Sequence, residues 1–420
     1  MKICKINNIF DGLAPLQRVE YCLMAVALAM LPISLAVSVF AVYAAVAAGV
    51  VGMVVNRRSL RTAVSGKSRL VRWGLGLMMA LWGLYAVSLL WTTNIPEGFL
   101  RVYKALPLLI LGFYFLVSDP TVYTWRRIRA VLWTQAAVLV VLFVVRLAVM
   151  LWKAVFDGVG YSRLTGDRFY HLHHAYMAYF LLMSIGFLYS EAIRLWEGIT
   201  VRYRVVLVSA IVALAAFVLF VNSRAGVLGL SMVAVLCLAH LAFVRRKWRA
   251  ALVVAGALAV SAGSVYMLLP NSAQRLSNTV IDPEENQKPD ARVTIYSIAL
   301  KAVADQPLGY GVGDYMDVLG EYYASNDYEG GKKARQNSHN QYIDTTLAIG
   351  VAGLALLLSL LVVFFIIAWR RRDVAAVIFL LVTAESIMFE AMFYRQWGLL
   401  LFCIAYGLFA ICPDEKNNAI

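Results

Sequence analysis

The chain has 420 residues, of which 62% are hydrophobic and only 15% are charged, whereas about a quarter of the residues in a soluble globular protein are charged. This composition excludes a soluble domain and predicts an all-α polytopic membrane protein. The formal net charge of +14 is spread over separate short loops, so it reflects membrane topology, and we expect no nucleic-acid binding.

Apolar runs recur along the chain, and a membrane span needs about 20 such residues. We expect about twelve spans in a single membrane domain over residues 1–420, with one long outside loop at 270–338 that contains helices. The expected spans lie near residues 21–36, 38–55, 74–91, 100–117, 130–152, 170–190, 203–221, 226–243, 250–269, 345–368, 374–392 and 396–412. The first two are short and separated mainly by Pro32, and no cleavage site follows the first, so we expect it to be retained.

Lys and Arg gather in alternate short loops, for example in RRKWR at 245–249 and WRRR at 369–372. By the positive-inside rule both termini are then cytoplasmic. The five cysteines form no CxxC pair, so neither a disulfide framework nor structural zinc is expected. HLHH at 171–174 lacks carboxylate ligands nearby, which favours interfacial packing over a bound metal.

The outside loop contains ARVTIYSIALKAVADQPLG at 291–309, in which Val293, Tyr296, Leu300 and Val303 have helical spacing. An amphipathic helix is expected there, with these residues facing the bundle or the lipid interface. The three glycines of PLGYGVGDY at 307–315 indicate tight turns, and the missing GK[ST] ending excludes a P-loop.

His339 lies where a polar stretch gives way to an apolar run. Ser338 and Gln341 fit a capping box, so we expect a helix to begin here with His339 in its first turn. The helix dipole would then favour a neutral imidazole base and attract an anionic ligand. An interfacial histidine that only anchors the helix fits this residue equally well.

Arginines lie at the outer ends of several expected spans, where the positive-inside rule disfavours them. They are Arg163, Arg168, Arg224, Arg292 and Arg395. Because guanidinium binds phosphate in a bidentate manner, this set suggests a phosphate or diphosphate substrate. Pairing with lipid headgroups, or with Glu390 and Asp314, is the alternative, and it explains Arg101 and Lys104 best.

Three segments occur in a fixed order: NSRAG, then DARVTIYSIALKAVADQPLGYGVGDY, then SHNQYIDTTLAIGVAGL. Together they resemble the O-antigen ligase and polymerase superfamily over roughly residues 205–410. FEAMFYRQWG also looks like the closing motif of some members. The resemblance implies a helical protein of the bacterial inner (cytoplasmic) membrane, whose periplasmic loop covers a cavity open to the outer leaflet.

In the ligases, a sugar chain on undecaprenyl diphosphate is transferred to a sugar hydroxyl of the lipid A core. The resemblance therefore implies this donor, this acceptor and membrane lipids as partners, with no cofactor. Carried over by position, Arg224 and Arg292 hold the diphosphate and His339 is the catalytic histidine. Asn340, Arg163, Arg168 and Arg395 are further candidates for substrate contacts.

Glycosyl transfer from a lipid diphosphate develops negative charge on the leaving group, which arginines stabilise as it forms. His339 would take the proton of the attacking hydroxyl, in one inverting displacement without a metal. A polymerase that joins lipid-linked repeats shares this chemistry and stays an alternative. A transporter or flippase is a third, although it predicts charges near mid-membrane, whereas these residues lie at one face.

Overall fold

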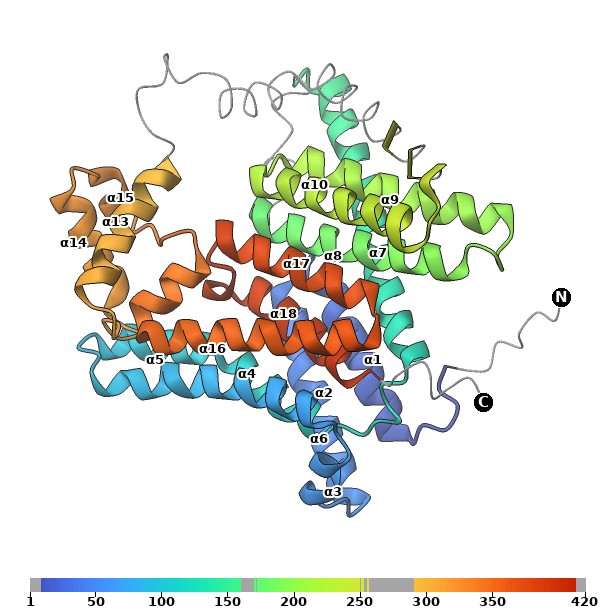
Figure 1. Cartoon of the computed structure of the whole chain (residues 1–420), viewed down its shortest axis with the longest axis horizontal. Helices are drawn as coiled ribbons and strands as arrows, with labels where there is room; N and C mark the ends of the chain where they lie inside the picture. The colour runs from blue at the N-terminus through green and yellow to red at the C-terminus, as the bar shows by residue number, and fades with distance from the viewer. Residues whose placement is uncertain are drawn as a thin grey trace. The chain divides into compact units, whose positions relative to one another are not determined.

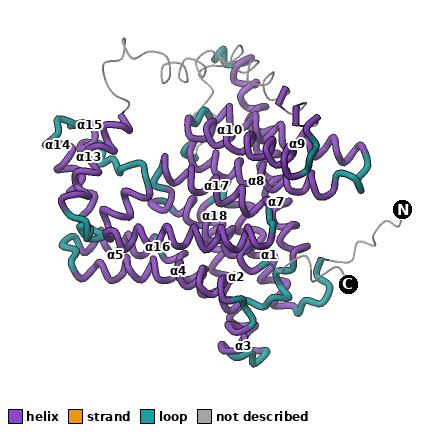
Figure 2. The backbone as a smooth tube through the Cα atoms, in the orientation of Figure 1, coloured by secondary structure: helices purple, strands orange, loops and turns teal. Residues whose placement is uncertain are grey.

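The computed structural model describes residues 9–159, 170, 172–249, 251–252, 255–256 and 291–412. All regular secondary structure in this part of the chain is helical (Figures 1 and 2). The chain divides into two compact units. The first comprises Met1–Gln135, Ile295–Leu380 and Glu390–Ile420, and the second comprises Ala136–Thr294 and Leu381–Phe389.

Most helices belong to the first unit. They are α1 (Pro15–Met30), α2 (Leu35–Val55), α3 (Leu60–Ser65), α4 (Arg69–Val87), η1 (Ser88–Leu90), α5 (Ile95–Lys104), α6 (Leu106–Val117), α14 (Tyr315–Ser325), α15 (Glu329–Lys333), α16 (Gln341–Arg371), η5 (Met392–Tyr394) and α18 (Gln396–Ile411). In this unit α4 packs against both α6 and α16, and α18 packs against α6 (Figure 1).

The second unit contains α8 (His174–Leu195), α9 (Val201–Val221), α10 (Arg224–Ala239) and the π-helix η4 (His240–Val244). Here α8 packs against both α9 and α10. Three helices contribute residues to both units: α7 (Trp125–Phe156), α13 (Ala291–Asp305) and α17 (Val374–Phe389).

Eight helical stretches among the described residues are long and apolar enough to cross a membrane. They are Leu35–Val55, Arg69–Leu90, Ile95–Val117, Trp125–Phe156, His174–Leu195, Val201–Val221, Arg224–Val244 and Gln341–Arg371. Each overlaps an expected span, which confirms an all-α protein with many membrane helices.

The other four expected spans are not confirmed as full crossings. The last two correspond to the shorter apolar helices α17 and α18. The first corresponds to α1, which has 16 residues and ends before Pro32, as the sequence indicated. Most of 250–269 lies outside the described residues.

The helix expected after residue 290 is present as α13, and two residues of the expected apolar face are exposed, as contact with the lipid interface would require. Val293 and Leu300 are 59% and 53% exposed. The buried residues are instead Ile295, Ile298, Ala299 and Ala302, which have the same helical spacing. Both sets of residues have the spacing of one helix face, and the small alanines allow a neighbouring helix to pack more closely. Spacing alone therefore could not show which face is buried.

The glycine-rich turn after α13 packs against a break in α16. Gly309 and Gly311 have positive φ, as the sequence predicted, and Gly350 in α16 has φ +71°. The backbone N–H of Tyr310 donates to Leu347 O at 2.8 Å, and that of Val351 donates to Pro307 O at 2.9 Å. The turn therefore hydrogen-bonds with the backbone groups that the kink removes from the helix ladder.

Candidate active site

His339 lies just before α16, not in its first turn as we expected. Asn340 is the N-cap, and its Oδ1 accepts from the N–H groups of Tyr342 at 2.9 Å and Ile343 at 3.2 Å. His339 itself has φ +50°, in the left-handed region. The capping-box assignment was wrong because asparagine is an equally good cap two residues later than serine.

A buried network stabilises this unusual backbone. The backbone N–H and the hydroxyl of Ser338 both donate to Asp344 Oδ1, at 3.1 and 2.6 Å. The N–H of His339 donates to Asn337 Oδ1 at 3.1 Å. Ser338 is fully buried and Asp344 is 3% exposed, so these bonds are shielded from water and hold the His339 backbone in place.

The imidazole of His339 pairs with a carboxylate that is distant in the sequence. Its Nδ1 lies 3.1 Å from Glu390 Oε2, and the side chains are 29% and 7% exposed respectively. Because a carboxylate only accepts hydrogen bonds, Nδ1 carries the proton in this pair. Nε2 of a neutral ring then keeps its lone pair, so it can accept a proton from a substrate.

A second contact, from α13, holds the backbone of the same residue. The hydroxyl of Tyr296 in α13 donates to the backbone O of His339 at 3.2 Å. Tyr296 was singled out in the sequence only for its helical spacing, and its polar tip is what reaches His339. The ring, its carboxylate partner and this tyrosine all belong to the first unit.

A pocket adjoins this region and is lined by residues from α4, α5, α6, α14, α16, η5 and α18. It holds about 480 Å³ of empty space, including space open to solvent. Gln341 and Asp344, which follow His339, line it together with Phe393 and Tyr394, which follow Glu390. Gln341 Oε1 accepts from the N–H of Phe393 at 2.7 Å, which joins these two stretches of chain.

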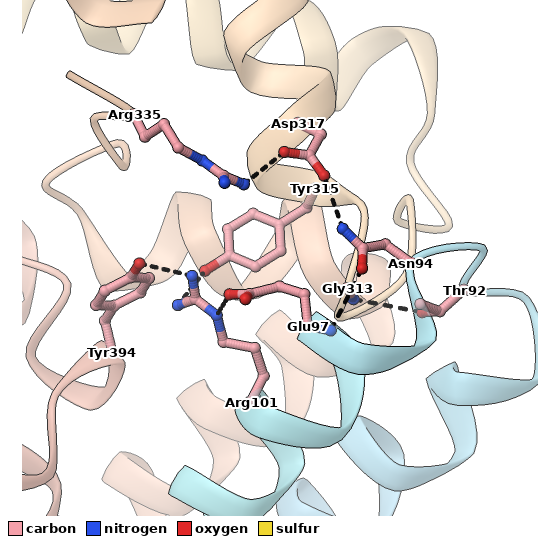
Figure 3. Close-up of polar contacts among 9 residues, drawn as sticks. All are labelled: Thr92, Asn94, Glu97, Arg101, Gly313, Tyr315, Asp317, Arg335 and Tyr394. Atoms are coloured by element: carbon pink, nitrogen blue, oxygen red, sulfur yellow. Dashed lines mark hydrogen bonds and ion pairs between the residues drawn. The ribbon is translucent and has the colours of Figure 1, made fainter. Parts of the chain in front are cut away.

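Arg101 lines this pocket, and its guanidinium lies among the side chains of Glu97, Tyr315 and Tyr394 (Figure 3). Its Nε donates to Glu97 Oε1 at 2.7 Å and its Nη2 donates to Tyr394 Oη at 2.6 Å. The guanidinium carbon also lies 3.7 Å from the centre of the Tyr394 ring. Arg101 is only 9% exposed, so the lipid-headgroup interpretation fails for it.

The segment around α14 is attached beside Arg101 by polar contacts with α5 and its preceding turn (Figure 3). The backbone N–H groups of Thr93 and Asn94 both donate to Asp314 side-chain oxygens at 2.7 Å. Asn94 Nδ2 also donates to Asp317 Oδ2 at 3.0 Å. Asp314 therefore binds backbone amides, where we had considered an arginine as its partner.

The other candidate residues are distributed as follows. Asn340 is 8% exposed and its side chain caps α16, which accounts for it structurally. Arg395 is exposed, immediately after the pocket residue Tyr394. Arg163 and Arg168 lie outside the described residues.

Arg224 and Arg292 both belong to the second unit. Arg224 is the first residue of α10, after the N-cap Ser223, and its side chain is exposed. Arg292 lies in the first turn of α13, where its charge acts on the carboxylate of Glu385. Glu385 in turn packs against Gly229 of α10, where an added Cβ would lie 3.0 Å from its Oε2.

Comparison with known proteins supports the resemblance seen in the sequence. No curated protein sequence matches the chain. A family model described as O-antigen ligase matches residues 208–358, which include Arg224, Arg292 and His339. This match implies a membrane enzyme that performs glycosyl transfer of the ligase or polymerase type on lipid-linked glycans. The family resemblance is thus confirmed over this stretch, and the chain is consistent with a member of the O-antigen ligase family.

Proposed function

We propose that the protein is an inverting, metal-independent O-antigen ligase, which transfers a polysaccharide from undecaprenyl diphosphate to a sugar hydroxyl of the lipid A core. The observation that carries this proposal is the His339–Glu390 pair, at 3.1 Å from Nδ1 to Oε2. The pair leaves Nε2 of His339 as the base for the acceptor hydroxyl. As that oxygen attacks the anomeric carbon, the proton passes to Nε2 and the carboxylate stabilises the imidazolium.

The leaving diphosphate requires positive charge, which Arg224 and Arg292 would supply. Two facts support this role. Both lie in the stretch matched by the family model, and arginine binds phosphate oxygens through two parallel N–H groups. Arginine charge would take the place of a divalent cation at the departing phosphate.

Removal of the ring tests the base directly. We expect His339→Ala to lower single-turnover transfer by about 10²–10⁴-fold, with the affinity for the lipid-linked donor nearly unchanged. His240→Ala is the matched control, because its ring bonds Tyr189 in the second unit. Wild-type turnover in His339→Ala would overturn the proposal, whereas loss of donor affinity would assign the ring to phosphate binding.

The acceptor is tested in cells by a lipopolysaccharide gel of a deletion strain. Loss of the complete O-chain ladder, with lipid-linked polymer accumulating, is expected of a ligase. A single repeat on the core would instead identify the polymerase, which the family match covers equally.

We further propose the inner membrane as location, with twelve crossings, both termini cytoplasmic and His339 at the periplasmic face. Cysteine tags at Arg335 should then react with an impermeant maleimide in cells with a permeabilised outer membrane, whereas tags at Lys247 should not. Labelling at Lys247 would invert this orientation.

A further inference from the structure

The pocket around Arg101 contains a hydrogen-bond acceptor that no protein group satisfies. Asp344 lines it, and only one of its two carboxylate oxygens is occupied. Oδ1 accepts both bonds from Ser338, whereas Oδ2 is buried without a hydrogen-bond partner. Since an unsatisfied buried acceptor is costly, this oxygen indicates a donor that a ligand would bring.

The remaining walls fit a hydroxyl-rich ring. Tyr85, Tyr315 and Tyr394 contribute aromatic surface. The amide of Gln341 accepts from Phe393 and donates to Thr345, which leaves one of its N–H groups for a ligand. Aromatic faces pack against the C–H face of a sugar, while carboxylate and amide groups accept and donate at its hydroxyls. A lipid acyl chain would leave the Asp344 oxygen unsatisfied, so the lining disfavours one.

The edge of the pocket carries uncompensated positive charge. Lys104 lines it and lies within electrostatic range of Arg101 and Arg395. Among the described residues, Glu97 is the carboxylate whose charge acts on Lys104. It already forms an ion pair with Arg101. In this part of the chain neither the Lys104 nor the Arg395 side chain has a hydrogen-bond or ion-pair partner. Two neighbouring cations without a counter-charge indicate an anionic group on the ligand.

We propose that this pocket is a subsite for an anionic saccharide, in which a sugar hydroxyl donates to Asp344 Oδ2 and a phosphate or carboxylate group binds Lys104 and Arg395. This deepens the proposed function, because it assigns the pocket to the acceptor, beside the base. Gln341 and Asp344 lie two and five residues after His339, so the acceptor sugar would be held next to the ring. Asp344 and Lys104 are binding and positioning residues, and His339 performs the proton transfer.

Binding of a phosphorylated core oligosaccharide, released from lipid A, tests the subsite by calorimetry on the full-length protein in nanodiscs without donor. We expect Asp344→Asn to weaken binding about tenfold or more, because a donor replaces the acceptor at the free oxygen. Lys104→Gln should weaken binding of the phosphorylated oligosaccharide about tenfold and leave binding of its dephosphorylated form unchanged. Lys333→Gln, an exposed lysine of α15, is the matched control and should bind as wild type.

Lys104 is half-exposed and unpaired, so its variant keeps the test valid even where Asp344→Asn folds poorly. Equal weakening of both oligosaccharides by Lys104→Gln would overturn the anionic part of the proposal. Wild-type binding by folded Asp344→Asn would overturn the hydroxyl contact. Binding of phosphatidylglycerol in place of the oligosaccharide would identify a lipid site and overturn the subsite.

The readout needs no turnover, so it separates the two proposals. Oligosaccharide binding that depends on Asp344 and Lys104, in a protein that transfers no glycan, would reject the proposed function and keep the subsite. Transfer activity with an unchanged acceptor KM in both variants would reject the subsite and keep the proposed function.

Discussion

The pair of His339 and Glu390 allows a quantitative prediction for Glu390→Gln. The amide keeps the size and one acceptor oxygen of the carboxylate but loses its charge, so the hydrogen bond to Nδ1 can persist while the imidazolium loses its counter-ion. The ring is neutral before proton transfer and charged afterwards. The substitution should therefore lower kcat and leave the donor affinity nearly unchanged.

The magnitude follows from the geometry. Two opposite unit charges about 4 Å apart attract by about 4 kcal/mol at an effective dielectric constant of about 20. The His339 side chain is 29% exposed, so we take roughly half of this value to account for solvent screening. A loss of about 2 kcal/mol in the transition state lowers kcat about 30-fold.

Single-turnover rates of Glu390→Gln, His339→Ala and the double variant provide the assay. If Glu390 acts only through the ring, the double variant should be as slow as His339→Ala alone. Glu321→Gln, an exposed carboxylate of α14, is the control and should match wild type. Rate losses that multiply in the double variant would refute the reasoning, because Glu390 would then act independently of His339.

Three further predictions concern other parts of the chain. Arg224→Lys and Arg292→Lys should each raise the donor KM about tenfold although the charge is kept, as measured by transfer kinetics, because lysine lacks the bidentate fork; wild-type values in both would exclude the diphosphate role. Gly350→Ala should lower the unfolding temperature, since its Cβ would lie 2.5 Å from Leu308 O at φ +71°, whereas Gly76→Ala meets nothing within 4 Å and should not. Burial lowers the pKa of Lys67, between α3 and α4, from 10.5 to about 8. Below pH 8 the charged amine thus destabilises the folded state by roughly 3 kcal/mol. This destabilisation is lost as the pH rises from about 8 to 10.5, because the amine in the folded protein loses its proton first. Lys67→Met should therefore raise the unfolding temperature at pH 7 but hardly at pH 10.5, and an equal increase at both would contradict the pKa.

Local patterns in the sequence were sufficient for much of the fold. Apolar runs identified the long helices because burial in a bilayer leaves no other way to satisfy the backbone. Glycines at 309 and 311 indicated the turns because few other residues adopt positive φ. His339 was found because a titratable group at the edge of an apolar run is uncommon.

Contacts between distant segments could not be predicted in this way. Glu390 lies 51 residues after His339, and nothing in its own neighbourhood indicates an imidazole partner. For Arg101 the sequence favoured lipid headgroups, or Glu390 and Asp314, as partners, whereas its side chain binds Glu97 and Tyr394. For Glu390, the one available signal was an acidic residue in an apolar segment that resembled a family motif.

The position of His339 outside α16 changes the physical origin of its proposed reactivity. In the first turn of a helix, the dipole would oppose a positive charge on the ring, which suits a base before the reaction but not the imidazolium that forms. In the structure, Asn340 already satisfies the first amides of α16, and the left-handed backbone at His339 directs the chain out of the helix. The charge that contacts the ring is the Glu390 carboxylate, which stabilises the protonated form as it develops. A left-handed backbone at a residue other than glycine costs about 1 kcal/mol or more, and the buried bonds between Ser338 and Asp344 offset that cost. The Asp344 carboxylate thus supports the backbone of His339 through Oδ1 and offers Oδ2 to the neighbouring pocket. It therefore couples the geometry of the proposed base to that of the proposed acceptor subsite.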